Sequence, residues 1–154
     1  MQKPLKIPRS VLVAILAPNQ QTLLIERADV PGFWQSVTGS QEDGETFAES
    51  AERELFEETG FVAREHGGLI DLNYENAYQI YPHWRHRYPA GTTHNLERCF
   101  AVRIAEPLPP KLAAREHVAH QWLPINAAIE RVASWSNAAV FRAQTLQNLL
   151  SKCE

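Results

Sequence analysis

The stretch from Gly39 to Phe61 reads GSQEDGETFAESAERELFEETGF, and it decides what this chain folds into. It is rich in glutamate, and Glu54, Glu57 and Glu58 follow an i, i+3, i+4 spacing. Residues three and four positions apart are neighbours on a helix surface, so this spacing places the three carboxylates on one helix face. Two carboxylates about 4 Å apart repel by roughly 4 kcal/mol at an effective dielectric of 20. Arg53, which we expect to point elsewhere, cannot neutralise all three.

A divalent cation would relieve this repulsion. Carboxylate oxygens are hard ligands that suit Mg²⁺, with Mn²⁺ as a possible substitute, and Mg²⁺ sites commonly include substrate phosphates. The helix face therefore favours phosphate chemistry. The alternative is an acidic helix face that is simply solvated.

The spacing around the glutamates carries a family signature. Gly39 is followed after five residues by Glu45, and after seven more by the run RELFEETGF from Arg53 to Phe61. This pattern resembles the box of the Nudix hydrolases at every defined position, which is far more specific than a lone glycine motif.

The resemblance implies an α/β protein with the Nudix fold, an α/β/α sandwich with a mixed sheet. It also implies an enzyme that uses Mg²⁺ to hydrolyse phosphoanhydride bonds of a small-molecule triphosphate. Glu54, Glu57 and Glu58 would be catalytic and bind the metal, while Arg53 and Glu45 would form a structural pair. The loop that starts at Gly39 would lie against the metal.

Length and charge narrow the possibilities further. We expect residues 1–154 to form a single domain with the box at 39–61, since a chain of this size buries about 68–70% of its unfolded surface. The net charge is −3 and there is no basic run, which argues against binding to long nucleic acid. Nothing in the sequence indicates the oligomeric state.

The apolar run Val11–Ala17 is too short to span a membrane, and we expect no membrane association. Cys99 and Cys153 are isolated and lack metal-ligand or redox spacing. This cysteine usage predicts a reducing, cytoplasmic location.

The box predicts a helix with defined ends. Thr46 is the expected N-cap with Glu49 three residues on, and Gly60 the left-handed stop. The expected buried stripe consists of Ala48, Ala51 and Leu55.

Hydrophobic patterns elsewhere predict strands and helices around this box helix. The first two strands should form a hairpin, and mixed strands with helices on both faces fit the sandwich. The expected strands are 11–17, 22–25, 33–38, 69–72, 77–81, 96–104 and 119–123, and the expected helices are 125–132 and 137–150, the latter capped by Ser136 or Asn137.

One further carboxylate is expected outside the box. The resemblance implies an additional catalytic or metal-binding glutamate before the strand that ends in Trp122-Leu123-Pro124, which makes Glu116 the candidate. The alternative is a solvated loop glutamate. His117 and His120 lie nearby, but a transition-metal site would need a third ligand that the sequence does not show.

Several segments outside the box narrow the resemblance. Phe33–Gly39 replaces the commoner Pro-Gly-Gly entry into the box, and 85–88, 91–95 and 134–137 agree with the same branch. The chain is similar, over most of its length, to Nudix enzymes that hydrolyse 7,8-dihydroneopterin triphosphate to the monophosphate and diphosphate in bacterial folate synthesis. Members of that branch also accept deoxynucleoside triphosphates such as dATP.

The same resemblance implies a set of substrate contacts. Cations could hold phosphate oxygens, aromatic residues could contact a bicyclic ring, and a hydroxyl could donate a hydrogen bond. On a regular strand, residues three apart face opposite sides, so we expect only one of the two tyrosines to meet the ring unless a bulge intervenes. The implied contacts are Lys6, Arg27, Thr38, Tyr78, Gln79, Ile80, Tyr81 and Ser134.

Other interpretations remain open from sequence. The cluster Arg85–Arg87 could bind phosphate or form a polar loop packed by aromatics. We expect Trp122 and Trp135 in the core, with the pocket wall as the alternative, rather than in the chemistry. The nearest rival function is a pyrophosphohydrolase for dATP or an oxidised nucleotide. A rival from another class is a non-catalytic Nudix binding domain, which would not need the intact glutamates.

Overall fold

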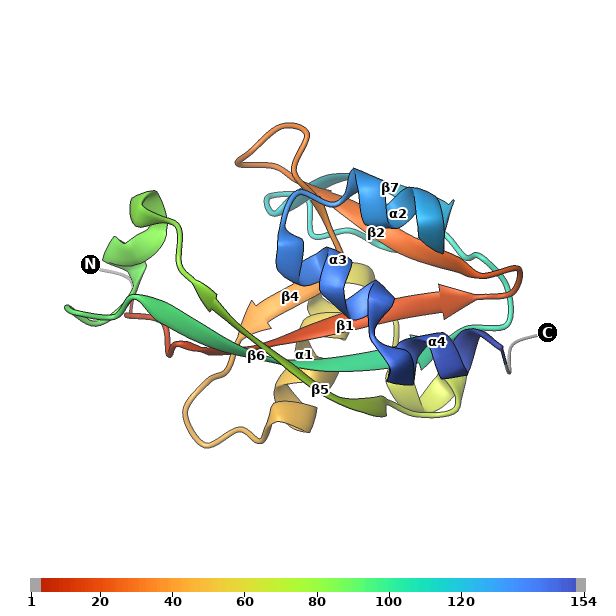
Figure 1. Ribbon diagram of the computed structural model, residues 1–154, viewed down its shortest axis with the longest axis horizontal. Coiled ribbons are helices and arrows are strands. Elements are labelled where there is room, and N and C mark those ends of the chain that lie inside the picture. The colour runs from red at the N-terminus through yellow and green to blue at the C-terminus, as the bar shows by residue number, and fades with distance from the viewer. Residues whose placement is uncertain (1–3, 152–154) are drawn as a thin grey trace.

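The computed structural model describes residues 4–151 of the chain, so the expectation about Cys153 lies outside the described residues. Its helices and strands follow one another largely in the predicted order (Figure 1). The elements are β1 (Arg9–Ala17), β2 (Gln21–Arg27), β3 (Trp34–Gln35), β4 (Val37–Ser40), α1 (Phe47–Thr59), η1 (Ala63–His66), β5 (Ile70–Gln79), η2 (Pro82–Arg87), β6 (His94–Arg103), β7 (His117–Pro124), α2 (Ile125–Arg131), α3 (Trp135–Arg142) and α4 (Gln144–Leu150).

The strands form one mixed sheet between two helical layers. Its order is β3-β2-β1-β6-β5, with β4 paired to β1 and β7 paired to β2. Only β1 and β6 run parallel among these pairs. Alternate residues of β1 enter two separate cores, one with α1 and the other with α2, α3 and α4. The predicted α/β/α sandwich is confirmed.

The sheet divides beside β1. Strand β2 pairs with β1 only at Leu16↔Thr22 and Ala17↔Gln21, while β4 pairs with the other end of the same strand edge, from Ser10 to Val13. Strands β1 and β2 therefore diverge after one short contact, and β4 occupies the wedge between them. This wedge brings the start of the box against the central strand.

The box helix forms as predicted at its ends. Thr46 and Glu49 make the reciprocal capping box, and Gly60 adopts a left-handed φ of 78°. Within the stripe, Ala51 and Leu55 are fully buried. The prediction for Ala48 is wrong, because Phe47 packs against this core in the first turn and Ala48 is exposed.

Two strand predictions differ from the structure. The strand expected at 33–38 is interrupted at Ser36, and the two strands expected at 69–72 and 77–81 are one strand, β5. A bulge interrupts the β5 register at Asn73, which takes a φ of 51° while its amide donates to Asp71 Oδ1. Because the bulge shifts the alternation of inward and outward side chains, the sequence pattern indicated two strands where the structure has one.

The helix expected at 137–150 is two helices. Ala143 is extended, with a ψ of 138°, and the Gln147 side chain donates to the Phe141 carbonyl that the break leaves free. The cap of the first helix is Ser134, whose hydroxyl accepts from the Asn137 amide, rather than Ser136 or Asn137.

The two tryptophans expected in the core differ in burial. Trp122 packs against the α1-side core and donates from Nε1 to the Leu108 carbonyl at 2.9 Å. Trp135 is 60% exposed at the start of α3, so its predicted burial is wrong. None of the helices in the described part of the chain is long and apolar enough to cross a membrane.

Candidate active site

The predicted site residues gather at one end of the sheet. Because β1 and β6 are parallel and their other neighbours antiparallel, the starts of β1, β6 and β7 and the ends of β2, β4 and β5 all lie at this end (Figure 1). The topology brings together Arg27 after β2, Thr38 on β4, Tyr78 near the end of β5, and Glu116 before β7.

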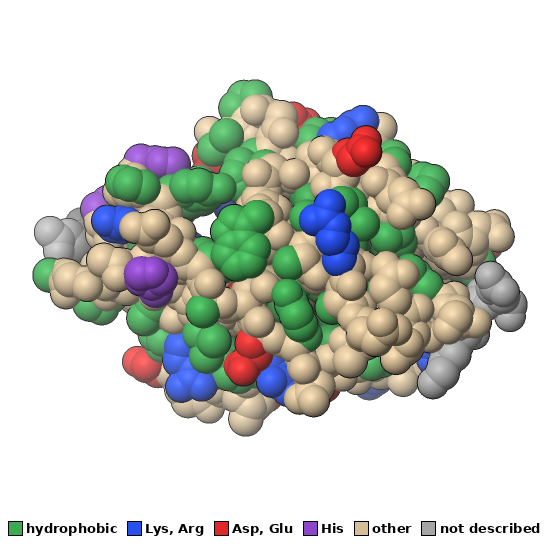
Figure 2. All heavy atoms as spheres, viewed as in Figure 1, with side chains coloured by type: hydrophobic (Ala, Val, Ile, Leu, Met, Phe, Trp, Pro, Cys, Tyr) green, Lys and Arg blue, Asp and Glu red, His purple; other side chains and the backbone are tan. Residues whose placement is uncertain are grey.

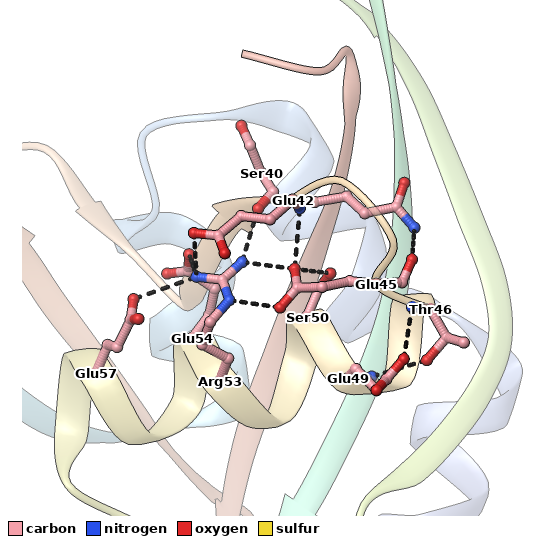
Figure 3. Close-up of polar contacts among 10 residues, drawn as sticks. Ser40, Glu42, Glu45, Thr46, Glu49, Ser50, Arg53, Glu54 and Glu57 are labelled. Atoms are coloured by element: carbon pink, nitrogen blue, oxygen red, sulfur yellow. Dashed lines mark hydrogen bonds and ion pairs between the residues drawn. The ribbon is translucent and has the colours of Figure 1, made fainter. Parts of the chain in front are cut away.

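Arg53 is the hub of the box loop (Figure 3). Its Nε lies 2.7 Å from Glu45 Oε2 and its Nη2 2.9 Å from Glu45 Oε1, a two-pronged contact. The same guanidinium donates to the Ser40 carbonyl and to Glu54, and it lies 3.3 Å from Glu57. The predicted pairing with Glu45 is confirmed. The expectation that Arg53 points away from the metal-site glutamates is wrong, because its Nη1 reaches two of them.

Replacing Arg53 with lysine is expected to lower the free energy of unfolding by about 1.5–3 kcal/mol, because an ammonium cannot make the forked, charge-assisted contact. The hydrogen bond from Arg53 holds the pKa of Glu45 down to about 2. Stabilisation from a depressed carboxyl is present above its unfolded pKa and is lost as the pH falls toward 2. Urea unfolding should therefore show a large difference at pH 7 and a smaller one near pH 3.

The matched control is Arg98→Lys. Arg98 donates to both oxygens of Asp71, but this pair is exposed on the surface and should contribute under about 1 kcal/mol. Equal losses in the two variants at pH 7 would show that the Arg53 contact has no special structural role.

Glu58 carries the strongest electrostatic anomaly of the site. Its side chain is 2% exposed, and neither carboxylate oxygen has a hydrogen-bond partner among the described residues. Burial first, and then the carboxylates of Glu54 and Glu116, raise its pKa well above the usual value. The nearest cationic candidate is His117, with Nε2 3.5 Å away. Burial lowers the pKa of His117 to about 4, so it is neutral at pH 7 and does not offset a negative charge on Glu58.

A backbone cradle lies against Glu54. The Glu54 carboxylate occupies the space where a side chain at position 39 would be, so any Cβ there would overlap it. Gly39 is therefore required for close approach to a carboxylate rather than for a special backbone angle.

Two further predicted residues lie within electrostatic reach of this cluster. Glu116 is exposed, and its negative charge raises the pKa of both Glu58 and Lys6. The pKa of Lys6 is lowered by burial of part of its side chain and by Arg87 and Arg27, while Glu54 and Glu116 oppose that shift. The structure thus places Glu54, Glu58, Glu116 and Lys6 within electrostatic reach of one another, whereas Glu57 is half exposed at the edge of the group.

A pocket opens beside the cluster, with about 510 Å³ of space that is partly open to solvent. Figure 2 shows a hollow in the surface between the lobe formed by η2 and the start of β6 and the body of the protein. Six of the eight predicted substrate contacts line the pocket, namely Arg27, Thr38, Tyr78, Ile80, Tyr81 and Ser134.

Both tyrosines reach the pocket because the strand ends between them. β5 stops at Gln79, so Tyr81 lies beyond the strand alternation that would place it opposite Tyr78. Gln79 is exposed and does not line the pocket, and neither does Lys6. Arg27 is held at the wall by two hydrogen bonds to Asp29 of 2.7 and 2.8 Å.

Comparison with known proteins agrees with this geometry. The NUDIX domain family matches residues 6–144. The chain belongs to the Nudix family. It is 42% identical over 137 residues to the dihydroneopterin triphosphate diphosphatase of Escherichia coli, covering 88% of this chain and 90% of that protein. It is 35% identical to the Haemophilus influenzae protein of the same name, covering 87% and 85%.

A solved structure gives the same result for the fold of this Nudix protein. The Escherichia coli dihydroneopterin triphosphate pyrophosphohydrolase superposes with a TM-score of 0.87 at 37% identity, covering 94% of this chain and 99% of that one. The Nudix fold and the resemblance drawn from the sequence are both confirmed.

Nudix hydrolases generally need a divalent metal ion, and the donor set here fits one. Within residues 4–151 no three His, Cys, Asp or Glu side chains converge as a ready ligand cluster. Arg53 engages Glu54 and Glu57, while both oxygens of buried Glu58 remain without partners. An unpaired buried carboxylate is costly unless a cation satisfies it, so the residues present fit a hard divalent cation.

The pocket also includes seven residues that the sequence did not single out as substrate contacts, namely Phe33, Gln35, Trp84, Tyr88, Glu97, Ser136 and Asn137. Glu97 could have been found, because it lies two residues before the buried Cys99 and therefore on the same inward side of an apolar strand. Trp84 belongs to the short helix η2, for which the sequence shows no periodic signal. In the structure Trp84 packs against Phe33 and Tyr81 with Arg27 over its ring, so the Arg85–Arg87 segment belongs to a loop packed by aromatics.

Proposed function

We propose that this protein is a Mg²⁺-dependent pyrophosphohydrolase that cleaves 7,8-dihydroneopterin triphosphate to dihydroneopterin monophosphate and diphosphate in folate biosynthesis. The observation that carries the proposal is the combination, in one chain, of the buried Glu58 carboxylate beside Glu54 with an adjacent aromatic pocket. The relatives of 42% and 35% identity, both named for this substrate, support the choice of the pterin.

Glutamates would hold the cation. Glu54 and Glu58 lie within mutual reach, with Glu116 beside them and Glu57 at the edge, and these four are the proposed catalytic and metal-binding residues. When bound, Mg²⁺ would neutralise phosphate charge and activate a water for attack on phosphorus. Mn²⁺ could replace it because the ligands are all hard oxygens.

The chain's other groups would bind and orient the substrate. The Lys6 ammonium lies within electrostatic reach of Glu54 and Glu116, so it could supply a counter-charge to a phosphate bound at the proposed metal site. Arg27, fixed by Asp29, presents a second cation at the pocket wall. Tyr78, Ile80 and Tyr81 would enclose the bicyclic ring. Thr38 lines the pocket and directly precedes Gly39, the first residue of the box.

Two members of the proposed contact set have specific places. The Ser134 hydroxyl accepts from Asn137 Nδ2 at 2.9 Å and lies 3.1 Å from the Ser136 hydroxyl, which leaves it able to contact a ligand in the pocket. Gln79 is exposed outside the pocket, so its contact would require a ligand that extends past the rim.

The test is product analysis with purified protein and Mg²⁺. Dihydroneopterin triphosphate, dATP, dGTP and an oxidised nucleotide are supplied at equal concentration, and diphosphate and monophosphate products are measured. The highest kcat/KM for the pterin, with diphosphate released, is the expected result. A higher kcat/KM for a nucleotide would move the enzyme to nucleotide-pool control, and no turnover of any substrate would leave a binding domain.

Other parts of the proposal follow from the sequence and the site. We propose one domain over residues 1–154 and a cytoplasmic enzyme, supported by the free, buried thiol of Cys99. The substrate is a small molecule rather than long nucleic acid, supported by a net charge of −3.

A further inference from the structure

A carboxyl group that the hydrolytic chemistry does not need lies in the pocket. Glu97 is 2% exposed on β6 and lines the pocket together with Tyr78 and Ser136. A buried carboxyl is costly unless it is paired, and within residues 4–151 no lysine, arginine or histidine forms an ion pair with it. Burial of the Glu97 carboxyl therefore costs folding free energy, and packing of the core does not require a carboxyl at this position.

The local contacts orient this carboxyl without satisfying it. Asn76 Nδ2 lies 3.3 Å from Glu97 Oε1 and donates also to the Ser136 carbonyl at 3.0 Å. Asn76 is thus anchored between β5 and the start of α3, and its amide directs donors toward Glu97. Among the described residues, this long hydrogen bond from Asn76 is the only side-chain hydrogen bond to the Glu97 carboxyl, and a carboxylate can accept about four, so most of its capacity to accept remains unused.

Neighbouring residues leave the carboxyl facing the ligand space. The pocket is walled by aromatic rings and hydroxyls, and its one guanidinium, from Arg27, is held by Asp29. Burial raises the pKa of Glu97 to about 7, with the Asn76 hydrogen bond opposing the shift. A ligand that donates two hydrogen bonds would hold this carboxyl in its ionised form.

We propose that the Glu97 carboxylate is the specificity-determining acceptor of the pocket, selecting rings that present two adjacent N–H donors. The 2-amino-4-oxopyrimidine edge of a pterin carries such a pair at its ring N–H and amino group, and guanine carries the same pair. Adenine offers an acceptor nitrogen beside its amino group, and that acceptor would face the carboxylate oxygen. This inference rests on the proposed function for the pterin, but it extends to any ring with that edge.

Glu97→Gln is the decisive variant because Asn76 fixes how the new amide is oriented. The Asn76 donor will hold the glutamine oxygen, which turns the glutamine NH₂ toward the ligand, where it opposes a donor pair. We expect kcat/KM for dihydroneopterin triphosphate and for dGTP to fall by a factor on the order of 100, since a site built to hydrogen-bond a ligand discriminates strongly when that match is lost. The kcat/KM for dATP should stay within about threefold of the wild-type value.

A binding measurement without metal provides a second readout. Neopterin fluorescence, titrated with wild-type protein and with Glu97→Gln, should report binding that the variant weakens by a similar factor. Glu75→Gln is the matched control, because Glu75 is an exposed glutamate of β5 that pairs with Arg98 rather than lining the pocket. That control should leave both readouts unchanged.

The outcomes separate this inference from the proposed function. If wild type ignores the pterin but prefers dGTP over dATP, and Glu97→Gln removes that preference, the donor-pair inference holds while the proposed substrate fails. Equal losses on all three substrates, or no loss on any, overturn the inference. If Glu97→Gln does not fold, Glu97→Asp is the second variant, because it keeps the charge on a shorter side chain. Its kcat/KM should fall by roughly tenfold for the pterin and for dGTP but not for dATP. An equal fall for all three substrates overturns the inference.

Discussion

Glu58→Gln is expected to lower turnover by at least about three orders of magnitude while making the metal-free protein more stable at neutral pH. Turnover falls because glutamine removes the charged oxygens that have no partner other than a cation. Stability rises because a buried, unpaired carboxyl is replaced by a neutral group of the same shape, a gain of about 1–3 kcal/mol.

The pH dependence identifies the cause of that gain. The pKa of Glu58 is raised in the folded protein, so the wild type loses stability as the pH rises from the unfolded pKa toward the folded value. The advantage of Glu58→Gln should therefore be absent near pH 4.5 and grow toward pH 8. Thermal unfolding without metal measures it, and added Mg²⁺ should raise Tm in wild type more than in the variant.

Glu57→Gln is the matched comparison. Glu57→Gln should also reduce turnover by orders of magnitude, because Glu57 is a proposed metal ligand. It should bring no gain in stability, because the Glu57 side chain is 52% exposed and contacts Arg53. A stability gain of the same size in both variants would contradict the account of Glu58, and near-normal turnover in both would refute the proposed metal site.

Gly39→Ala is expected to reduce kcat by about 100-fold or more while changing the free energy of unfolding by less than about 1 kcal/mol. The new methyl group would occupy the position of the Glu54 carboxylate, which must swing away. A displacement of about 1 Å in a catalytic group can cost 10²-fold in rate. The fold is spared because the obstacle is the flexible end of a side chain rather than backbone.

A double variant tests that explanation. Glu54→Asp shortens the side chain and should itself impair turnover, but it also makes room for the methyl group at position 39. The two changes should therefore cost less together than the product of their separate effects, because residues in contact combine non-additively. Strict multiplication of the two rate losses would indicate that the alanine acts elsewhere.

The sequence predicted the parts of this protein that depend on local pattern. The i, i+3, i+4 glutamates, the Thr46 cap and the Gly60 stop each follow from residues within one or two turns, and the fold followed from the spacing of the box. The Arg53–Glu45 contact was also predictable, because both residues belong to the same motif.

The features that the sequence did not predict depend on tertiary contacts. No glycine or proline marks the break at Ala143, which the Gln147 side chain stabilises by donating a hydrogen bond from Nε2 to the Phe141 carbonyl. The reach of Arg53 to Glu57 is the exception, because it is an i, i+4 contact within one helix that the spacing allowed and our expectation for Arg53 overlooked. The pocket residues Trp84 and Glu97 come from segments that meet only through the strand order.

The short contact between β1 and β2 has a consequence for how this protein can change. Because the sheet divides there, β4 leads the box into α1, which carries the proposed metal ligands Glu54, Glu57 and Glu58, with Glu116 before β7. The proposed ring contacts lie mainly on β5, on β6 and at the start of α3. Few residues belong to both sets, so mutations that retune ligand preference need not disturb bond cleavage. New substrates could thus be acquired through changes on β5, β6 and α3 while α1 and the segment before β7 keep the proposed chemistry.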